Sequence, residues 1–452
     1  MKRIFMLLAA GIIGGCFFMW GNLSLLESLS VIMFVYFLLK FLDDLGNQIT
    51  ILDVPVLLAC LTWLVMPIVF YHFYTRQVYI ANLWKFYMPI ESDDYFSFVL
   101  PATIAMWVGL KLKFKKTEFD LHPQKYLTNL KQVLVGRSRI GFILITVGLI
   151  SGFIYFIVPS ALKQVAYFGK QLSYVGMFYI YFSDSSKKKS ILIGMFTLVL
   201  LQSIASGMFG ELIYLSLLST ILIALNTRIR FWVKLVTGVA GLFFVLLIQN
   251  LKNEYRAIAW KTGSDPALFV RLAVQNITDP SSMLQANKMF RTAVRMNQGW
   301  LIAKTMYYVP RKISYAEGET IGATVLSVIV PRVFWPDKRE VGGAYNLKRF
   351  WGYNLKGYSM DIGAIGEGYG NFGVAGGIIF MFFYGLLFNM ILRKLLKKTQ
   401  THPTYLCWLP LLFVSSVVVE TDMLNTINSL LKGLVFMWFV FWSFKTFFKI
   451  SL

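Results

Sequence analysis

The sequence predicts an all-α, polytopic integral membrane protein with about twelve transmembrane helices. Of its 452 residues, 57% are hydrophobic and only 15% are charged, whereas soluble domains carry about 25% charged residues. Apolar runs of about 17–25 residues, each long enough to cross a bilayer as a helix, recur along the whole chain. Lys and Arg concentrate in the short connectors between these runs, where the positive-inside rule places them in the cytoplasm.

The apolar runs before the longest polar stretch are predicted to form spans one to nine. Residues 191–225 are interpreted as two short spans, because this keeps Lys187–Lys189 and Arg228 on the same side of the membrane. Lys2 and Arg3 followed by the apolar stretch up to Cys16 also resemble a lipoprotein signal peptide, and a retained first span is the preferred interpretation. The predicted spans cover residues 4–20, 23–42, 51–74, 95–112, 140–159, 164–182, 191–225 (as two spans joined at Ser206–Gly210) and 231–249.

The domain organisation follows from one long polar stretch. Residues 1–249 contain spans one to nine, 250–369 form a loop with amphipathic and re-entrant helices, and 370–452 contain spans ten to twelve. Crossings counted from a cytoplasmic amino terminus place both termini in the cytoplasm and this loop on the extracytoplasmic side. The loop holds 16 Lys/Arg against nine Asp/Glu, which long external loops tolerate. The last three spans are predicted at 370–392, 405–419 and 430–448.

Composition excludes several other functional classes. The net charge of +22 lies mainly in connectors, so no nucleic-acid partner is predicted. The three cysteines (Cys16, Cys60 and Cys407) fall within apolar runs and show no disulfide or metal-ligand spacing. The three histidines are scattered, which argues against a zinc site. We therefore expect neither a metal nor a cofactor.

Arginines in the long loop are the first candidate site residues. Arg256 lies just beyond the ninth span, and Asp279 followed by Pro280 predicts a helix that continues to about Tyr308. On this helix Arg291 and Arg295 are four residues apart and share a face. Two adjacent guanidiniums suit a phosphate or pyrophosphate, since each donates bidentate hydrogen bonds. The alternative is that both side chains snorkel to the lipid headgroups.

The second half of the loop adds a short apolar segment, aromatic residues and carboxylates. Residues 321–330 are too few to cross the bilayer and are predicted to be re-entrant or interfacial, with Arg332 at their end. Asp361 and Glu367 lie among closely spaced glycines at the start of span ten, and a carboxylate at a membrane boundary is a functional hypothesis by default. Glu367 has an alternative role in an ion pair with a loop arginine. Glu211 and Glu420, at other outer span ends, are weaker candidates.

Four sequence blocks in this loop carry a resemblance to a known family. They are Arg-Met-Asn-Gln-Gly-Trp (295–300), Gly-Glu-Thr-Ile (318–321), Pro-Arg-Val-Phe-Trp-Pro-Asp-Lys (331–338) and Gly-Glu-Gly-Tyr-Gly-Asn-Phe-Gly (366–373). Together they resemble bacterial O-antigen polymerases of the Wzy type. The resemblance is dense from about Arg256 to Leu387. Elsewhere it consists of the number of spans and the position of the large loop.

The resemblance implies a metal-independent glycosyltransferase of the bacterial inner membrane with its active site facing the periplasm. Such an enzyme moves a growing glycan from undecaprenyl pyrophosphate onto a lipid-linked oligosaccharide repeat unit. Arginines would hold the pyrophosphates and stabilise the leaving group, and a carboxylate would be the general base. The lipid-linked oligosaccharide and the bilayer are the expected partners, and the resemblance leaves a chain-length regulator open as a third.

The resemblance, combined with the residue types, assigns a role to each candidate. Glu367 is the favoured base, with Asp361 and Glu319 in reserve. The predicted pyrophosphate ligands are Arg256, Arg291, Arg295 and Arg332. The other predicted substrate-binding residues are Lys338, Trp335, Trp351 and Tyr369, the three aromatic residues as sugar contacts.

Two other functions remain open on the sequence. A lipid-linked oligosaccharide flippase or transporter also has about twelve spans, but transporters place ionisable groups near the bilayer midplane, whereas here such groups lie near the span ends. An O-antigen ligase is the main enzymatic alternative. The long loop contains no histidine, and the related ligases typically have one there. The sequence does not identify the sugar, the linkage or the anomeric outcome.

Overall fold

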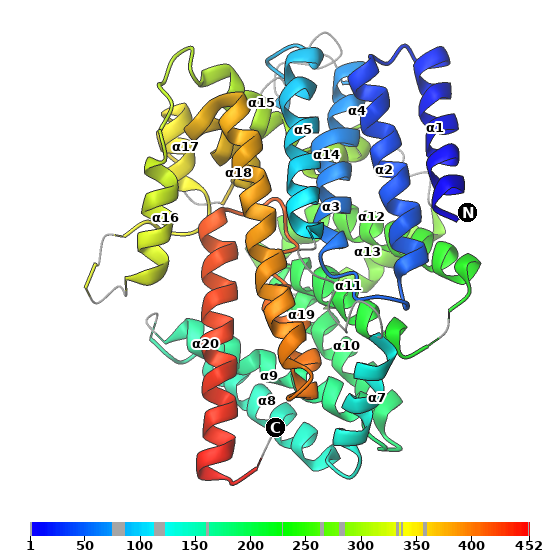
Figure 1. Cartoon of the computed structure of the whole chain (residues 1–452), viewed down its shortest axis with the longest axis vertical. Coiled ribbons are helices and arrows are strands. Elements are labelled where there is room, and N and C mark those ends of the chain that lie inside the picture. The colour runs from blue at the N-terminus through cyan, green and yellow to red at the C-terminus, as the bar shows by residue number, and fades with distance from the viewer. Residues whose placement is uncertain are drawn as a thin grey trace.

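The computed structural model shows an α-helical bundle in which no β-strand occurs among the described residues. Long helices run side by side through the molecule, and shorter helices cover one end of it (Figure 1). The structure describes residues 2–74, 86–112, 123–159, 162–227, 229–262, 266–279, 285–330, 334–335, 338–355, 359–450 and 452.

The first part of the chain forms α1 to α12, with a π-helix between α3 and α4. Helix-favouring apolar runs bounded by Gly, Pro and Asp residues account for these elements. Their bounds are α1 Lys2–Trp20, α2 Leu25–Asp44, α3 Asp53–Ala59, η1 Cys60–Val65, α4 Met66–His72, α5 Ser92–Lys111, α7 Pro123–Leu134, α8 Ser138–Ile154, α9 Lys163–Phe182, α10 Lys188–Ser206, α11 Gly210–Leu225 and α12 Phe231–Thr262.

The remainder of the chain contains short helices, of which α14, α15 and α17 lie toward the upper end in Figure 1, and the last long helices. Their bounds are α13 Pro266–Thr278, α14 Ala286–Met296, α15 Gly299–Tyr308, α16 Glu319–Ile329, α17 Ala344–Trp351, α18 Gly363–Lys398, η4 Pro403–Trp408, α19 Leu409–Phe413 and α20 Met423–Phe447.

Several helices are long and apolar enough to cross a membrane. Among the described residues six meet this condition by length and composition, or seven if the bent pair α7–α8 counts as one span. The chain is therefore an all-α protein with features of a multi-pass membrane protein. Residues 191–225 form two helices, as predicted, separated by Gly207 in a left-handed conformation. The predicted span 405–419 is not one continuous helix, because only η4 and the five-residue α19 occur there and α19 ends at Phe413.

The helix bounds differ from the predicted ones at several places. Helix α12 continues to Thr262 rather than ending near residue 249, because the polar residues after the apolar run are themselves good helix formers. Helix α18 begins at Gly363, seven residues before the predicted start of span ten at residue 370. The predicted continuous helix to Tyr308 was wrong: it is divided into α14 and α15 by Asn297 and Gln298. Its predicted start at residue 280 lies outside the described residues.

Close glycine contacts hold α5 against α18. A Cβ atom on Gly109 would overlap the carbonyl oxygen of Phe382, and one on Gly385 would overlap that of Met106. Small residues allow this approach because dispersion between closely packed backbones drives helix association in lipid. The pair fixes α18, which carries candidate site residues at its amino-terminal end.

We expect Gly385→Ala to destabilise the protein by about 1–3 kcal/mol, because the added methyl group must push α5 away from α18. The matched control is Gly194→Ala on α10, where a Cβ would meet no atom within 4 Å. That substitution should be neutral or stabilise by up to about 1 kcal/mol. Thermal unfolding of the detergent-solubilised variants compares the two, and equal melting temperatures would contradict the packing role of Gly385.

Backbone carbonyl groups that precede Pro67 of α4 accept hydrogen bonds from other parts of the chain, including the loop. Pro67 has no N–H, so carbonyl groups of the preceding turn are left without a helical donor. The Trp63 carbonyl accepts the hydroxyl of Tyr95 at 2.8 Å, and the Thr62 carbonyl accepts the backbone N–H of Gln298 at 3.1 Å. The break between α14 and α15 is thereby fixed to the helical bundle.

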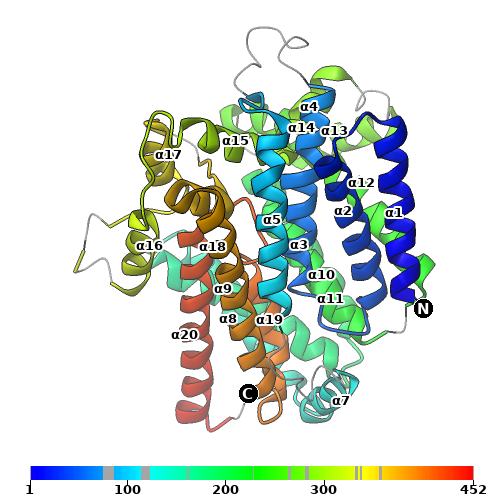
Figure 2. The ribbon, with the colours of Figure 1, turned by 45° about the horizontal axis from the view of Figure 1, so that its top comes forward.

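A kink divides α18 into a short upper segment and a long lower one (Figure 2). Gly373 adopts φ 68° and ψ −159°, a conformation open mainly to glycine. The kink frees the carbonyls of Gly370 and Asn371, which accept the N–H groups of Ala316 and Glu317 at 3.0 and 3.1 Å. The upper segment of α18 is thus hydrogen-bonded to the loop rather than continuing as a straight span.

Candidate functional site

A cavity of about 780 Å³ lies where α14 and α15 face the loop before α18 and the start of α20. This volume is within the range typical of ligand sites, about 300–1,000 Å³. One wall carries Arg291 and Arg295, and another carries Asp361, Glu420 and Asp422. The cavity therefore combines cationic groups with carboxylates, which is the combination that the sequence predicts for a site.

The cationic wall belongs to α14. Arg291 and Arg295 share its cavity face, as their spacing predicts, and both side chains are exposed. Neither guanidinium makes a hydrogen bond or an ion pair with another described residue. Lys252 and Arg256 on α12 interact electrostatically with Arg295, so like charges gather here. Such a cluster is stabilised by a bound anion.

Contacts with α12 hold α14 in this position. Lys288 pairs with Glu254 at 2.8 Å, and the Thr292 hydroxyl donates to the side-chain oxygen of Asn250 at 3.2 Å. Arg295 lies one turn after Thr292, and the contacts with α12 therefore position it near Lys252. The remaining predicted cation of this group, Arg256, donates from Nε to the Gly207 carbonyl at 2.6 Å.

Asp361 provides the least satisfied carboxylate of the cavity. Its side chain is only 6% exposed, and its Oδ1 accepts the N–H of Gly363 at 2.8 Å. Its buried Oδ2 has no hydrogen-bond partner. Burial raises the pKa of Asp361 well above the usual range for an aspartate, and the charges of Asp422 and Glu367 raise it further. A carboxyl group with a raised pKa and an available oxygen is suited to proton transfer.

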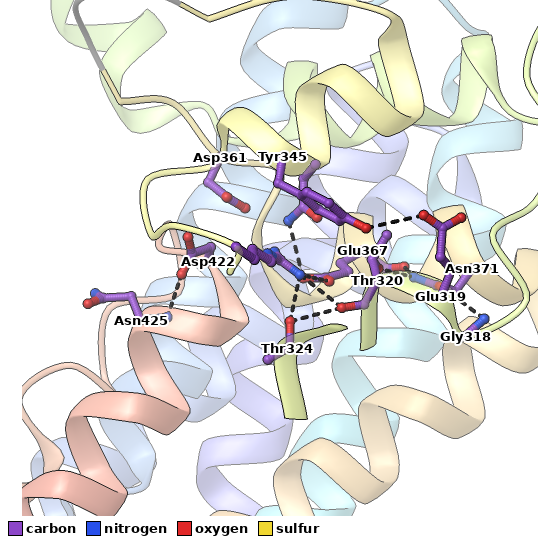
Figure 3. Close-up of polar contacts among 12 residues, drawn as sticks. Gly318, Glu319, Thr320, Thr324, Tyr345, Asp361, Glu367, Asn371, Asp422 and Asn425 are labelled. Carbon is purple, nitrogen blue, oxygen red and sulfur yellow. Dashed lines mark hydrogen bonds and ion pairs between the residues drawn. The ribbon is translucent and has the colours of Figure 1, made fainter. Parts of the chain in front are cut away.

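Asp422, beside Asp361, is a carboxylate with both oxygens occupied. Its Oδ1 caps α20 by accepting the N–H of Asn425, and its Oδ2 accepts the N–H of Gly342 at 2.7 Å. Both oxygens of Asp422 are thus occupied by backbone donors, whereas Oδ2 of the neighbouring Asp361 has no hydrogen-bond partner. Figure 3 shows the two carboxylates on facing segments.

Glu420 links the acidic wall with the cationic one. Its oxygens accept the side-chain amide of Gln298 at 3.1 Å and the Tyr214 hydroxyl at 3.5 Å. It also interacts electrostatically with Lys252. Because Gln298 is itself hydrogen-bonded to Thr62 of η1, this contact fixes the end of α14 relative to the start of α20.

Glu367, the favoured base in the sequence, lies in a buried ion pair. It is 0% exposed, and its Oε1 contacts Nη1 of Arg339 at 2.9 Å. Its Oε2 accepts the Asn346 amide at 3.2 Å, and Nη1 of Arg339 also donates to the carbonyl of Thr320 at 2.9 Å. Glu367 does not line the cavity. The geometry thus corresponds to the alternative role, an ion pair, and leaves Asp361 as the carboxyl group with an unoccupied oxygen at the cavity (Figure 3).

The other predicted polar residues have separate positions. Glu319 is about half exposed and pairs with Arg349 at 2.8 Å, whose hydrogen bond lowers the pKa of Glu319. Lys338 donates to the carbonyls of Ser327 and Val330 at 2.8 and 2.7 Å, where a cation is favoured at the end of α16. Arg332 lies outside the described residues.

The aromatic residues at the cavity differ from those predicted. Trp300 and Phe86 line it and meet edge to face at 5.2 Å between ring centroids. Trp351 packs behind Trp300 and donates its indole N–H to Thr305 at 3.1 Å. Tyr369 is buried and donates to the Val309 carbonyl at 3.3 Å. Trp335 is half-buried and is not among the residues that line this cavity.

Residues missed at the cavity had only weak sequence signals. Asp422 is the N-cap of an apolar helix, and an aspartate at this position is explained by capping alone. Trp300 lies within the Arg-Met-Asn-Gln-Gly-Trp block but carries no chemical signal of its own. Phe86 comes from a connector far away in sequence, and only the fold brings it to Trp300.

A second cavity, of about 660 Å³, is less suited to chemistry. It lies along α18 below the kink and is lined mainly by aromatic and aliphatic side chains, with Glu317 as its charged residue. No group of three or more His, Cys, Asp or Glu side chains within the described ranges is arranged to hold a metal ion. The charged cavity is therefore the candidate site.

Comparison with known proteins identifies one family. The model of a family described as a domain of unknown function, DUF8712, matches residues 98–448. These residues include most of α5, the helices from α7 to α20 and all the charged groups of the cavity. No curated protein and no solved structure matches the chain. Because the match spans well over half of the sequence, the chain belongs to the DUF8712 family.

Proposed function

We propose that the protein is a polysaccharide polymerase that transfers a growing glycan from a polyprenyl pyrophosphate carrier to a lipid-linked oligosaccharide repeat unit. The observation that supports this function best is the cavity that places Arg291 and Arg295 opposite the buried carboxyl group of Asp361. Paired arginines bind pyrophosphate oxygens. A carboxylate with a raised pKa accepts a proton more readily at neutral pH than an ordinary aspartate does.

In the proposed reaction, Asp361 takes the proton of an acceptor sugar hydroxyl as that oxygen attacks the anomeric carbon of the donor. A new glycosidic bond forms, and the bond from that carbon to the pyrophosphate oxygen breaks with its electron pair. The leaving polyprenyl pyrophosphate is stabilised by Arg291 and Arg295. The proton on Asp361 then passes to solvent. Trp300 and Phe86 provide flat apolar surfaces for sugar rings.

We further propose that the chain has about twelve spans in a bacterial inner membrane, with both termini cytoplasmic and the cavity facing the periplasm. The basic carboxyl-terminal end of α18, which includes Lys397 and Lys398, favours a cytoplasmic position. The cavity-forming loop lies at the opposite end of that helix (Figure 1). Helix α16 then lies at the membrane interface, since Ile329 at its end is 69% exposed. The bilayer would hold the lipid tail of each substrate.

The double variant Arg291→Gln plus Arg295→Gln tests the proposed function. Each charged hydrogen bond contributes about 1.5–3 kcal/mol, or roughly tenfold or more in binding. We therefore expect kcat/KM for transfer to fall about 100-fold and single repeat units to accumulate. The assay incubates purified protein in detergent with lipid-linked repeat units and resolves the products on a gel.

The matched control is Lys397→Gln plus Lys398→Gln, which removes two cations at the other end of α18. This control should produce a normal ladder of products. A wild-type protein that yields no ladder but moves lipid-linked units across vesicles would identify a flippase instead. Transfer to a preformed lipid A core, with no chain growth, would identify a ligase.

A further inference from the structure

Cations and aromatic rings alternate along one side of α15 and the turn after it. The alternation begins at Trp300, which lines the cavity. One turn later, the ammonium of Lys304 lies 5.5 Å from the Trp300 ring centroid and 5.3 Å from that of Trp351. Arg311 lies 5.6 Å from the ring of Tyr307.

Lys312 completes this row, which we call the α15 track: Trp300, Lys304, Tyr307, Tyr308, Arg311 and Lys312. The Lys312 ammonium lies 5.5 Å from the Tyr307 ring centroid and 5.1 Å from that of Tyr308. Residues separated by four, seven and eight positions share a helix face, so the track leads away from the cavity along α15. Arg311 and Lys312 are exposed, and neither pairs with a carboxylate among the described residues.

The open side of α15 does not resemble a membrane-facing surface. No large hydrophobic side chain is exposed among the described residues from 290 to 324. Exposed apolar side chains begin immediately afterwards, at Val325, Leu326 and Ile329 on α16, with 46, 53 and 69% exposure. Helix α15 lies at the same end of the molecule as α14 and α17 (Figures 1 and 2). The track therefore faces water rather than lipid tails.

We infer that the α15 track binds an anionic glycan, in which sugars bearing carboxylates follow one another. Aromatic rings stack on the apolar faces of sugars, and the exposed cations Arg311 and Lys312 beside them attract carboxylates. Aromatic rings and cations alternate along the track, as sugar rings and carboxylates alternate along an acidic polysaccharide. This inference rests on the proposed function for the identity of the bound chain, as substrate or product, and it narrows the substrate class to acidic polysaccharides.

A binding experiment tests the track without requiring transfer. Full-length protein in nanodiscs of zwitterionic lipid is titrated with fluorescent oligogalacturonate and with a malto-oligosaccharide of equal length, in about 50 mM salt. We expect the acidic oligosaccharide to bind at least about tenfold more tightly than the neutral one. The variant Lys304→Gln plus Arg311→Gln plus Lys312→Gln should weaken that binding about tenfold or more. The matched control, Lys187→Gln plus Lys188→Gln plus Lys189→Gln, should leave it unchanged.

Three results would overturn the inference. They are equal affinity for the two oligosaccharides, unchanged affinity in the track variant, and equal losses in both triple variants. A track variant that loses only anionic lipid, detected by native mass spectrometry, would assign the cations to a lipid surface. The variant Arg291→Gln plus Arg295→Gln separates the two proposals, because it should retain oligogalacturonate binding on the track while losing transfer.

Discussion

Asp361→Asn is expected to reduce the rate of glycan transfer by about 10²–10⁴-fold, the usual contribution of a general base. The amide has nearly the shape of the carboxyl group but cannot accept the proton of the acceptor hydroxyl. Binding of the lipid-linked substrate should change little, since Arg291 and Arg295 remain in place. Single-turnover transfer measured with purified protein, together with a substrate-binding titration, separates the two effects.

The same substitution is expected to leave the fold intact or to stabilise it at neutral pH. Oδ2 of Asp361 is buried without a partner, and an amide at this position can donate to the neighbouring Asp422. Asp422→Asn is the matched control, because its amide keeps only one acceptor oxygen and should destabilise the protein by leaving one of two backbone N–H groups, that of Gly342 or that of Asn425, without an acceptor. A variant Asp361→Asn that transfers glycan at the wild-type rate would remove Asp361 from the mechanism.

The pH dependence of the wild type follows from the raised pKa of Asp361. Only the ionised form accepts a proton, so the transfer rate should rise with pH through that raised pKa. Stability should change in the opposite direction. The folded state holds the proton more tightly than the unfolded chain, so the stability due to this group is present at low pH. It is lost as the pH rises from the ordinary value for aspartate through the raised one. Asp361→Asn should abolish both trends, as rate and unfolding profiles against pH would show.

The helical fold was largely predictable because the bilayer imposes a simple rule on the sequence. Long apolar runs must form helices, since unpaired backbone groups are too costly in lipid, and helices occupy most of the predicted runs, the run 405–419 being the clearest exception. Helix ends were less predictable. The break at Asn297 and Gln298 depends on a carbonyl that Pro67 leaves free more than two hundred residues earlier. No local sequence pattern indicates a contact between residues so far apart in the chain.

The candidate site was predictable where local spacing decides the geometry. Arg291 and Arg295 share a helix face and line one cavity. The choice among carboxylates depended on tertiary contacts, because Arg339 lies beyond the short apolar segment and its pairing with Glu367 follows from the fold. A glycine-rich segment around a carboxylate indicates close packing, but it does not indicate whether a cation or a substrate occupies that space.

Glu367→Gln is expected to lower the stability of the protein by about 3–5 kcal/mol, the usual effect of leaving one charge of a buried pair without its partner. The Arg339 side chain is 1% exposed and has no other carboxylate in hydrogen-bonding contact among the described residues. Such a loss corresponds to a decrease on the order of 10 °C in melting temperature. Thermal unfolding in detergent, followed by tryptophan fluorescence, measures it.

The double variant Arg339→Gln plus Glu367→Gln decides between the two roles of Glu367. Two facing amides can hydrogen-bond to each other and to the Thr320 carbonyl and Asn346 amide that the ion pair now engages, so most of the lost stability should return. If the pair is structural, this double variant transfers glycan at close to the wild-type rate. If Glu367 is the base, the double variant folds but loses transfer by at least about 10²-fold, and Asp361 must then have another role. Because stability and rate are measured on the same sample, a damaged fold cannot be mistaken for a missing base.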